Sequence, residues 1–174
     1  MGVTGCGKTT VGALLAQDCG WAFHDADDFH PAANVAKMKS GIPLADADRW
    51  PWLDRLNALL RDSDGEGKSL VLACSALKQV YRERLARACN TVRFVLLDGD
   101  REMIRARLAG RQGHYMNPKL LDSQFAILER PHDALRLDAA ESPAVLVRKI
   151  RESLEVEHEV PRTGASPGRI GGTP

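Results

Sequence analysis

The segment with the clearest chemistry is GVTGCGKT at residues 2–9, which matches the phosphate-binding pattern GxxxxGK[ST] in full. In such a loop the glycines let successive backbone N–H groups turn toward phosphate oxygens, and the lysine reaches the β- and γ-phosphates. The hydroxyl after the lysine is a ligand for Mg²⁺. We therefore expect nucleotide contacts from Gly2, Thr4, Gly5, Cys6, Gly7, Lys8, Thr9 and Thr10.

A second group, DADDFHP at residues 25–31, follows a short stretch that is typical of a strand. In a parallel sheet the carboxyl end of that strand lies beside the phosphate-binding loop. Two carboxylates two residues apart can divide the work, Asp25 holding Mg²⁺ through water and Asp27 accepting the proton of an attacking hydroxyl. A loop that caps the next helix is the alternative, and it is the better interpretation of Asp28. His30 beside these acids is a substrate-binding candidate.

Two basic residues stand where they could bind an acidic substrate. Arg49, in the segment PLADADRWPWL, could hold a carboxylate through two hydrogen bonds, although the segment also fits a capped helix start. Lys78 follows a buried-type strand, at the edge of the sheet where ligands bind, and a solvated helix face is the equal alternative. Both are substrate-binding candidates.

The stretch at residues 108–119 has the composition of a mobile lid, with an arginine between two glycines. A guanidinium on such a lid could reach a transferring phosphoryl group, which makes Arg111 a catalytic candidate. Arg107 is a nucleotide-binding candidate and His114 a substrate-binding one. A plain helix–helix connection with solvated arginines is the alternative.

Helical and strand-like patterns alternate along residues 1–155, which predicts one α/β domain with a parallel sheet. Residues 156–174 are rich in Gly and Pro, and we expect them to form a disordered C-terminal tail. The expected strands are residues 21–25, 69–74, 91–97 and 134–138. The expected helices are residues 8–19, 31–39, 48–61, 77–89, 101–109, 120–129 and 142–154.

Composition narrows the class of protein further. The 174 residues carry 24 Lys and Arg against 23 Asp and Glu, a net charge of +1 that gives no reason to expect a nucleic-acid or membrane surface. No apolar run approaches the ~18 residues of a membrane span. The four cysteines lack metal-like spacing and fit a reducing cytoplasm. The chain has no NKxD base-specificity motif, which argues against a GTPase and for phosphoryl transfer to a hydroxyl.

With these segments in chain order, the sequence resembles the gluconokinase family of P-loop small-molecule kinases, which are shikimate-kinase-like. The resemblance covers residues 2–150 and depends on GVTGCGKTT, DADDFHP, GIPLADADRWPWL, CSALKQVYR and RLAGRQGHYM. The second, third and fourth of these segments together are far more specific than the phosphate loop alone.

The resemblance implies a P-loop kinase fold, with a parallel sheet sandwiched by helices, and a homodimer. It also implies ATP- and magnesium-dependent phosphorylation of the 6-hydroxyl of D-gluconate, with Asp27 holding or deprotonating that hydroxyl and Lys8 and Arg111 stabilising the phosphoryl charge. The groups left for the polyol and its carboxylate are Arg49, Lys78, His30 and His114. A kinase of shikimate or of a nucleoside is one alternative, and a nucleotide-binding protein without catalytic competence is another.

One feature conflicts with that fold. Only Met1 precedes the phosphate-binding loop, whereas such a loop normally follows a central parallel strand. We therefore expect the first, central strand to be missing from this chain, which leaves backbone groups of its neighbours unpaired. We also expect the natural protein to start upstream, with an apolar segment of about five to ten residues.

Overall fold

The computed structural model describes residues 1–110 and 118–155. Its strands are β1 (Ala22–Asp25), β2 (Leu70–Ala73), β3 (Val95–Asp98) and β4 (Leu135–Asp138). Its helices are α1 (Lys8–Cys19), the 3₁₀ helix η1 (Ala26–Phe29), α2 (Ala32–Lys39), α3 (Asp46–Gly65), α4 (Gln79–Ala86), α5 (Arg101–Ala109), α6 (Pro118–Ile127) and α7 (Pro143–Ser153).

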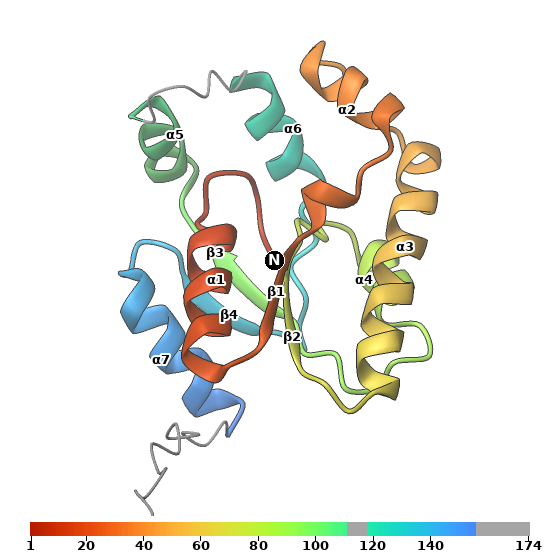
Figure 1. Cartoon of the computed structure of the whole chain (residues 1–174). Coiled ribbons are helices and arrows are strands. Elements are labelled where there is room, and N and C mark those ends of the chain that lie inside the picture. The colour runs from red at the N-terminus through yellow and green to blue at the C-terminus, as the bar shows by residue number, and fades with distance from the viewer. Residues whose placement is uncertain (111–117, 156–174) are drawn as a thin grey trace, which may run out of the picture.

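Helices cover both faces of the strands. In Figure 1, α1 and α7 lie on one side and α3 and α4 on the other, with the strands between them. The strand pairs are parallel: Ala22 of β1 lies opposite Leu70 of β2, and Val95 of β3 opposite Leu135 of β4. The carboxyl ends of the strands point toward α2, α5 and α6. The predicted α/β architecture with helices on both faces is confirmed.

The strands form two separate two-stranded sheets, because β2 and β3 do not pair with each other. The N-terminus lies between the two pairs (Figure 1). Toward β3, the Met1 amino group donates to the Val95 carbonyl, and the Met1 carbonyl accepts the Leu97 N–H at 3.0 Å. Toward β2, the Gly2 N–H donates to the Ser75 carbonyl at 3.2 Å. These two residues therefore occupy the end of the central strand position, and no strand fills the rest of it within the described residues.

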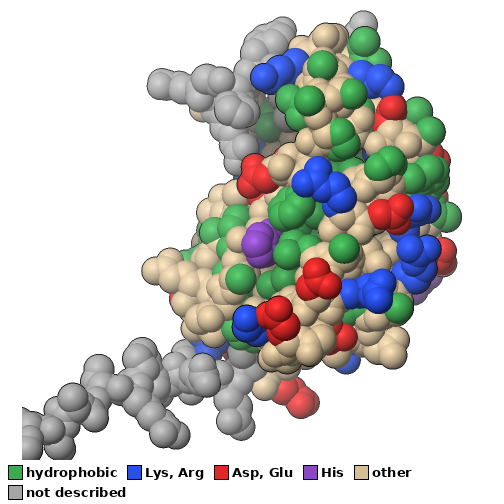
Figure 2. Space-filling model, turned by 45° about the vertical axis from the view of Figure 1, so that its right-hand side comes forward, with side chains coloured by type: hydrophobic (Ala, Val, Ile, Leu, Met, Phe, Trp, Pro, Cys, Tyr) green, Lys and Arg blue, Asp and Glu red, His purple; other side chains and the backbone are tan. Residues whose placement is uncertain are grey.

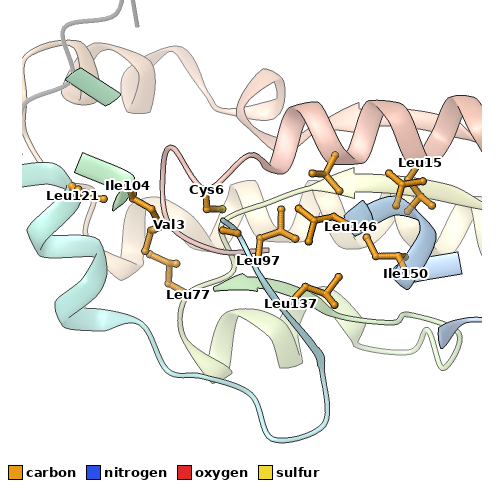
Figure 3. Close-up of a cluster of buried hydrophobic side chains, with 13 residues drawn as sticks. Val3, Cys6, Leu15, Leu77, Leu97, Ile104, Leu121, Leu137, Leu146 and Ile150 are labelled. Atoms are coloured by element: carbon orange, nitrogen blue, oxygen red, sulfur yellow. The ribbon is translucent and has the colours of Figure 1, made fainter. Parts of the chain in front are cut away.

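Two apolar clusters hold the helices to the strands. One lies among α1, β3, β4, α5, α6 and α7 and includes Val3, Leu97 and Ile104 (Figure 3). The other lies between α3, α4 and β2, where Leu53 and Leu56 of α3 are fully buried. Each such leucine contributes about 1.5–3 kcal/mol relative to an exposed one.

Helix and strand ends differ from prediction at two informative places. Helix α3 begins two residues before its predicted start, where the Asp48 carboxylate accepts the Ala45 N–H at 2.9 Å and closes the first turn. Strand β3 begins at Val95 rather than residue 91, because its pairing with β4 begins at Leu135 and, among the described residues, Met1 alone bonds the edge that faces β2.

The surface agrees with the balanced charge of the sequence. On the face shown in Figure 2, acidic and basic side chains are interspersed among apolar ones. None of the helices in the described ranges is long and apolar enough to cross a membrane.

Candidate active site

The phosphate-binding loop leads directly into α1. Gly7, with φ of 100°, caps the amino end of α1, whose free N–H groups and positive dipole end favour an anion. Gly5 also has a positive φ, 79°, and a Cβ there would lie 2.8 Å from the Leu108 side chain. Glycine at this position therefore meets both a backbone and a packing requirement.

The side chains of the loop point in different directions. Cys6 is 1% exposed and points into the apolar core (Figure 3), so it can offer a ligand only its backbone. The Lys8 ammonium folds back on the loop and donates to the Val3 carbonyl at 3.0 Å. The Thr4 N–H donates to the side-chain oxygen of Gln124 in α6 at 2.6 Å, a contact that the sequence did not predict.

The two predicted metal ligands lie together. The Thr9 hydroxyl donates to the Asp25 carboxylate at 2.8 Å. A hydroxyl and a carboxylate are hard oxygen donors that suit Mg²⁺, which usually keeps several waters and shares the phosphates of its substrate. Among the described residues no group of three or more His, Cys, Asp and Glu could hold a metal. The pair therefore fits a magnesium ion that is held mainly by water and a nucleotide.

A cavity of about 270 Å³ adjoins the loop where it enters α1. Thr10 and Arg107, both predicted to bind nucleotide, line it together with the segment that follows β4. Arg107 is held there by hydrogen bonds to the carbonyls of Ala139, at 2.6 Å, and Ala140, at 3.4 Å. The structure thus places Thr10 and Arg107 beside the loop.

Asp27 stands at the end of β1, where the chain turns into η1. The Asp25 carboxylate accepts the Asp27 N–H at 3.1 Å and caps η1, which leaves the Asp27 side chain 86% exposed in the site. Its pKa is raised, first because neighbouring protein displaces part of its hydration and then because Asp25 is close. Lys8 and His30 oppose this rise. A carboxylate with a raised pKa and a free surface is suited to accept a proton.

His30 is buried against η1, α2 and α3. Its side chain is 5% exposed, it stacks on Trp52 with ring centroids 4.3 Å apart, and its Nε2 lies 4.0 Å from the Asp27 carboxylate. The Asn34 amide nitrogen bonds the Asp48 carbonyl at 2.8 Å and His30 Nδ1 at 3.4 Å. Because an amide nitrogen only donates, Nδ1 accepts and the proton of the neutral ring is on Nε2, toward Asp27.

Burial lowers the pKa of the His30 imidazole; Asp27 opposes this effect and Arg49 adds to it, and the net shift favours the neutral ring. The ring therefore offers the site a hydrogen-bond donor rather than a second positive charge. Asn34, which is buried, fixes the orientation of that donor.

Arg49 and Lys78 lie in one cluster, joined by two residues that sequence reasoning did not single out. The Asp46 carboxylate accepts hydrogen bonds from Lys78 Nζ at 2.9 Å and from the Tyr81 hydroxyl. Arg49 donates to the same hydroxyl at 3.2 Å and lies 3.8 Å from Asp46. The hydrogen bonds from Tyr81 and Lys78 lower the pKa of Asp46. The contact between these two residues could not be predicted from local spacing, because residues 46 and 81 lie far apart in the sequence and on different helices.

Several predictions fall outside the described residues. Arg111, His114 and most of the lid predicted at residues 108–119 belong to this group, as does the tail predicted at residues 156–174. They stay predictions, as does the boundary of the domain at residue 155.

Comparison with known proteins points to one family. A family model described as shikimate kinase matches residues 4–155. A probable gluconokinase of Rattus norvegicus is 48% identical over 149 residues, which cover 75% of this chain and 80% of that protein. The structure of a sugar kinase from Janibacter sp. HTCC2649 superimposes with a TM-score of 0.84 at 41% identity, over 90% of this chain and 92% of that one. A gluconokinase structure from Sinorhizobium meliloti 1021 gives 0.79 at 37% identity, over 89% and 93%.

Proposed function

Because the chain belongs to the gluconokinase family, we propose that it transfers the γ-phosphoryl group of ATP to the 6-hydroxyl of D-gluconate. One observation supports this most: Lys8 and Thr9 of the phosphate-binding loop adjoin Asp25 and Asp27 at the end of β1. Groups suited to a triphosphate and a carboxylate suited to a hydroxyl proton therefore share one site.

In the transfer step, the 6-hydroxyl oxygen forms a bond to the γ-phosphorus while the bond from that phosphorus to the bridging oxygen of ADP breaks. Asp27 takes the hydroxyl proton, and its raised pKa makes it a stronger base than an ordinary aspartate. Lys8, released from the Val3 carbonyl when phosphate enters, stabilises the charge on the phosphoryl oxygens. Arg111 is proposed to act on the same charge from the lid.

Thr9 and Asp25 would hold the magnesium ion, which supplies charge neutralisation at the phosphates when bound. The base and ribose of ATP are assigned to the cavity beside Thr10 and Arg107. Its position next to the amino end of α1 is compatible with phosphates at the loop.

The substrate side of the site is assigned to the residues beyond Asp27. His30 offers a neutral N–H donor, and Arg49 and Lys78 offer positive charge next to a tyrosine hydroxyl. This set suits a small polyol acid, whose hydroxyls need fixed hydrogen-bonding groups and whose carboxylate needs cations. His114 on the lid is proposed to join them. The homodimer and the cytoplasmic location implied by the resemblance stay predictions.

A coupled ADP-release assay tests the proposal on a panel of D-gluconate, shikimate and nucleosides, with Lys8→Met as the inactive control. We expect turnover with D-gluconate and a product carrying one phosphoryl group on the 6-hydroxyl. Turnover with shikimate or a nucleoside instead would assign a different acceptor. ATP binding without phosphorylation of any acceptor would identify a nucleotide-binding protein.

A further inference from the structure

Helix α6 and the two residues after it contact both halves of the proposed active site. The helix lies at the carboxyl ends of the strands, between α5 and α2 (Figure 1). Gln124 of α6 bonds the phosphate-binding loop, and Glu129, two residues beyond the end of α6, bonds the turn that carries Lys78. One short segment therefore reaches the residues proposed for the nucleotide and a cation proposed for the acidic substrate.

The bond from Gln124 acts on the peptide group that also holds Lys8. Gln124 Oε1 accepts the Thr4 N–H at 2.6 Å, and the carbonyl of the same peptide group, that of Val3, accepts Lys8 Nζ at 3.0 Å. A trans peptide group is planar, so its N–H and its C=O point in opposite directions and turn together. Gln124 therefore fixes the orientation of the carbonyl to which Lys8 is bonded.

At the other end of the segment, Glu129 bonds the residues on both sides of Lys78. Its backbone N–H donates to the Leu77 carbonyl at 2.9 Å, and its carboxylate accepts the Gln79 N–H. Lys78 is the N-cap of α4 but its side chain makes no capping hydrogen bond, so the Glu129 carboxylate supplies the cap. Glu129 thus fixes the backbone from which Lys78 extends toward Asp46.

The turn before Lys78 needs such support. Ala76 has a φ of 44°, in the left-handed region that a residue with a Cβ adopts only at a cost. Arg82, which is buried, donates to the carbonyls of Ala76 at 3.1 Å and Leu77 at 3.2 Å. Because strained backbone persists only where its surroundings hold it, the position of the Lys78 backbone depends on the contacts from Arg82 and Glu129.

Apolar packing joins the same three parts of the chain. Val3 of the loop, Leu77 of the turn and Leu121 of α6 belong to one buried cluster, with Ile104 of α5 among them (Figure 3). Leu121 is 1% exposed and Leu77 is 4% exposed. Because side chains in a close-packed cluster do not move independently, a shift of the loop is transmitted to α6 and to the turn.

We propose that Gln124 and Glu129 are positioning residues, which align the phosphate-binding loop with Lys78 through α6. This role rests on the proposed function, in which Lys8 binds the phosphoryl group and Lys78 the acidic substrate. Phosphoryl transfer needs its two reactants held in one geometry, and a misplacement of about 1 Å can cost about 10²-fold in rate. A nucleotide that orders the loop therefore also orders the turn that carries Lys78.

Hydrogen exchange at the Gln79 amide, with and without saturating AMPPNP, tests this alignment without turnover. Binding of this ATP analogue should slow the exchange by about threefold or more in the unaltered chain. Gln124→Leu removes the acceptor of the Thr4 N–H, so the slowing should be lost even when the analogue is saturating. Ser123→Ala is the matched control, because it removes only a hydroxyl that bonds the Leu120 carbonyl within α6, and it should keep the slowing.

Steady-state kinetics test the alignment in the reaction itself. Gln124→Leu should lower kcat by about tenfold with both substrates saturating. Glu129→Ala should raise KM for D-gluconate by about fivefold and change KM for ATP by less than about twofold, because it releases the turn that carries Lys78. Glu129→Gln keeps a side-chain oxygen that can accept the Gln79 N–H, so it should restore most of the affinity.

Equal slowing of the Gln79 amide in the unaltered chain and in Gln124→Leu would overturn the proposal, and so would the absence of slowing in both. A lower Tm with unchanged kcat and KM would also overturn it, since Gln124 and Glu129 would then only stabilise the fold. If the unaltered chain does not turn over D-gluconate, the proposed function is wrong, and the exchange experiment still decides whether α6 links the loop to the turn.

Discussion

Asp27 and Asp46 are two carboxylates of the same site with opposite surroundings. Asp27 is exposed, its carboxylate lies 4.0 Å from His30 Nε2, and its pKa is raised. Asp46 accepts hydrogen bonds from Lys78 and Tyr81, lies near Arg49, and has a lowered pKa. The difference shows how one site can keep one aspartate basic and use another to position cations.

This comparison predicts the largest loss of activity at Asp27. We expect Asp27→Asn to lower kcat by about 10²- to 10⁴-fold, because the amide cannot accept the hydroxyl proton. The Tm should change little, since the side chain is exposed. Steady-state kinetics and a thermal melt measure both. Asp28→Asn, one residue away and also exposed, is the matched control and should keep near-normal turnover; if Asp27→Asn does so too, the proton acceptor is wrongly assigned.

A smaller effect is expected at the Asp46 cluster, and it should fall on binding. Lys78→Met removes a cation that Asp46 holds toward the substrate side, so KM for D-gluconate should rise by about tenfold while kcat changes by less than about threefold. Lys68→Met is the control, because Lys68 is exposed and pairs with the exposed Glu66. If the variant lowers kcat and leaves KM unchanged, Lys78 acts in the transfer step. The assignment of the Asp46 cluster to substrate binding would then be wrong.

The smallest effect concerns stability against pH, where the two aspartates should differ in sign. A lowered pKa stabilises the fold above the unfolded value near 3.8, and this gain is lost as the pH falls through the folded value. A raised pKa does the opposite, so the Asp27 carboxylate costs stability at neutral pH.

Asp46→Asn should therefore lower the Tm at neutral pH, and Asp27→Asn should leave it equal or slightly higher. The difference in Tm between the two variants should narrow as the pH falls below about 3.8 and then through the lower folded pKa of Asp46. Thermal melts across this range measure it. If the difference in Tm between the two variants does not change with pH, packing rather than charge is its cause.

Local sequence signals were sufficient to predict most of the helices and strands. Helices α1 and α5 occupy their predicted ranges, and the Asp100 side chain caps α5 by accepting the N–H groups of Glu102 and Met103. These features depend on residues within one or two turns of each other. The pairing of Thr9 with Asp25 joins two elements, but it was predictable because a phosphate-binding loop and the end of the neighbouring strand adjoin in a parallel α/β fold.

Long-range contacts were not predictable in this way. Nothing in the two segments indicates that Asp46 bonds Lys78 or that Arg49 bonds Tyr81, because these contacts require α3 to pack on α4. The role of Gln124 over the phosphate-binding loop likewise depends on where α6 lies.

By itself, the sequence determined the phosphate-binding loop, the acidic strand end and the conflict at Met1, because each is a matter of residue types at short spacing. Only the tertiary structure decided which carboxylate stays free and which is compensated, since donors from distant helices set the pKa of each. It also placed Met1 and Gly2 between the two strand pairs, where they bond Val95 and Leu97 on one side and Ser75 on the other. Those hydrogen bonds join residues far apart in the sequence, so they exist only in the folded chain.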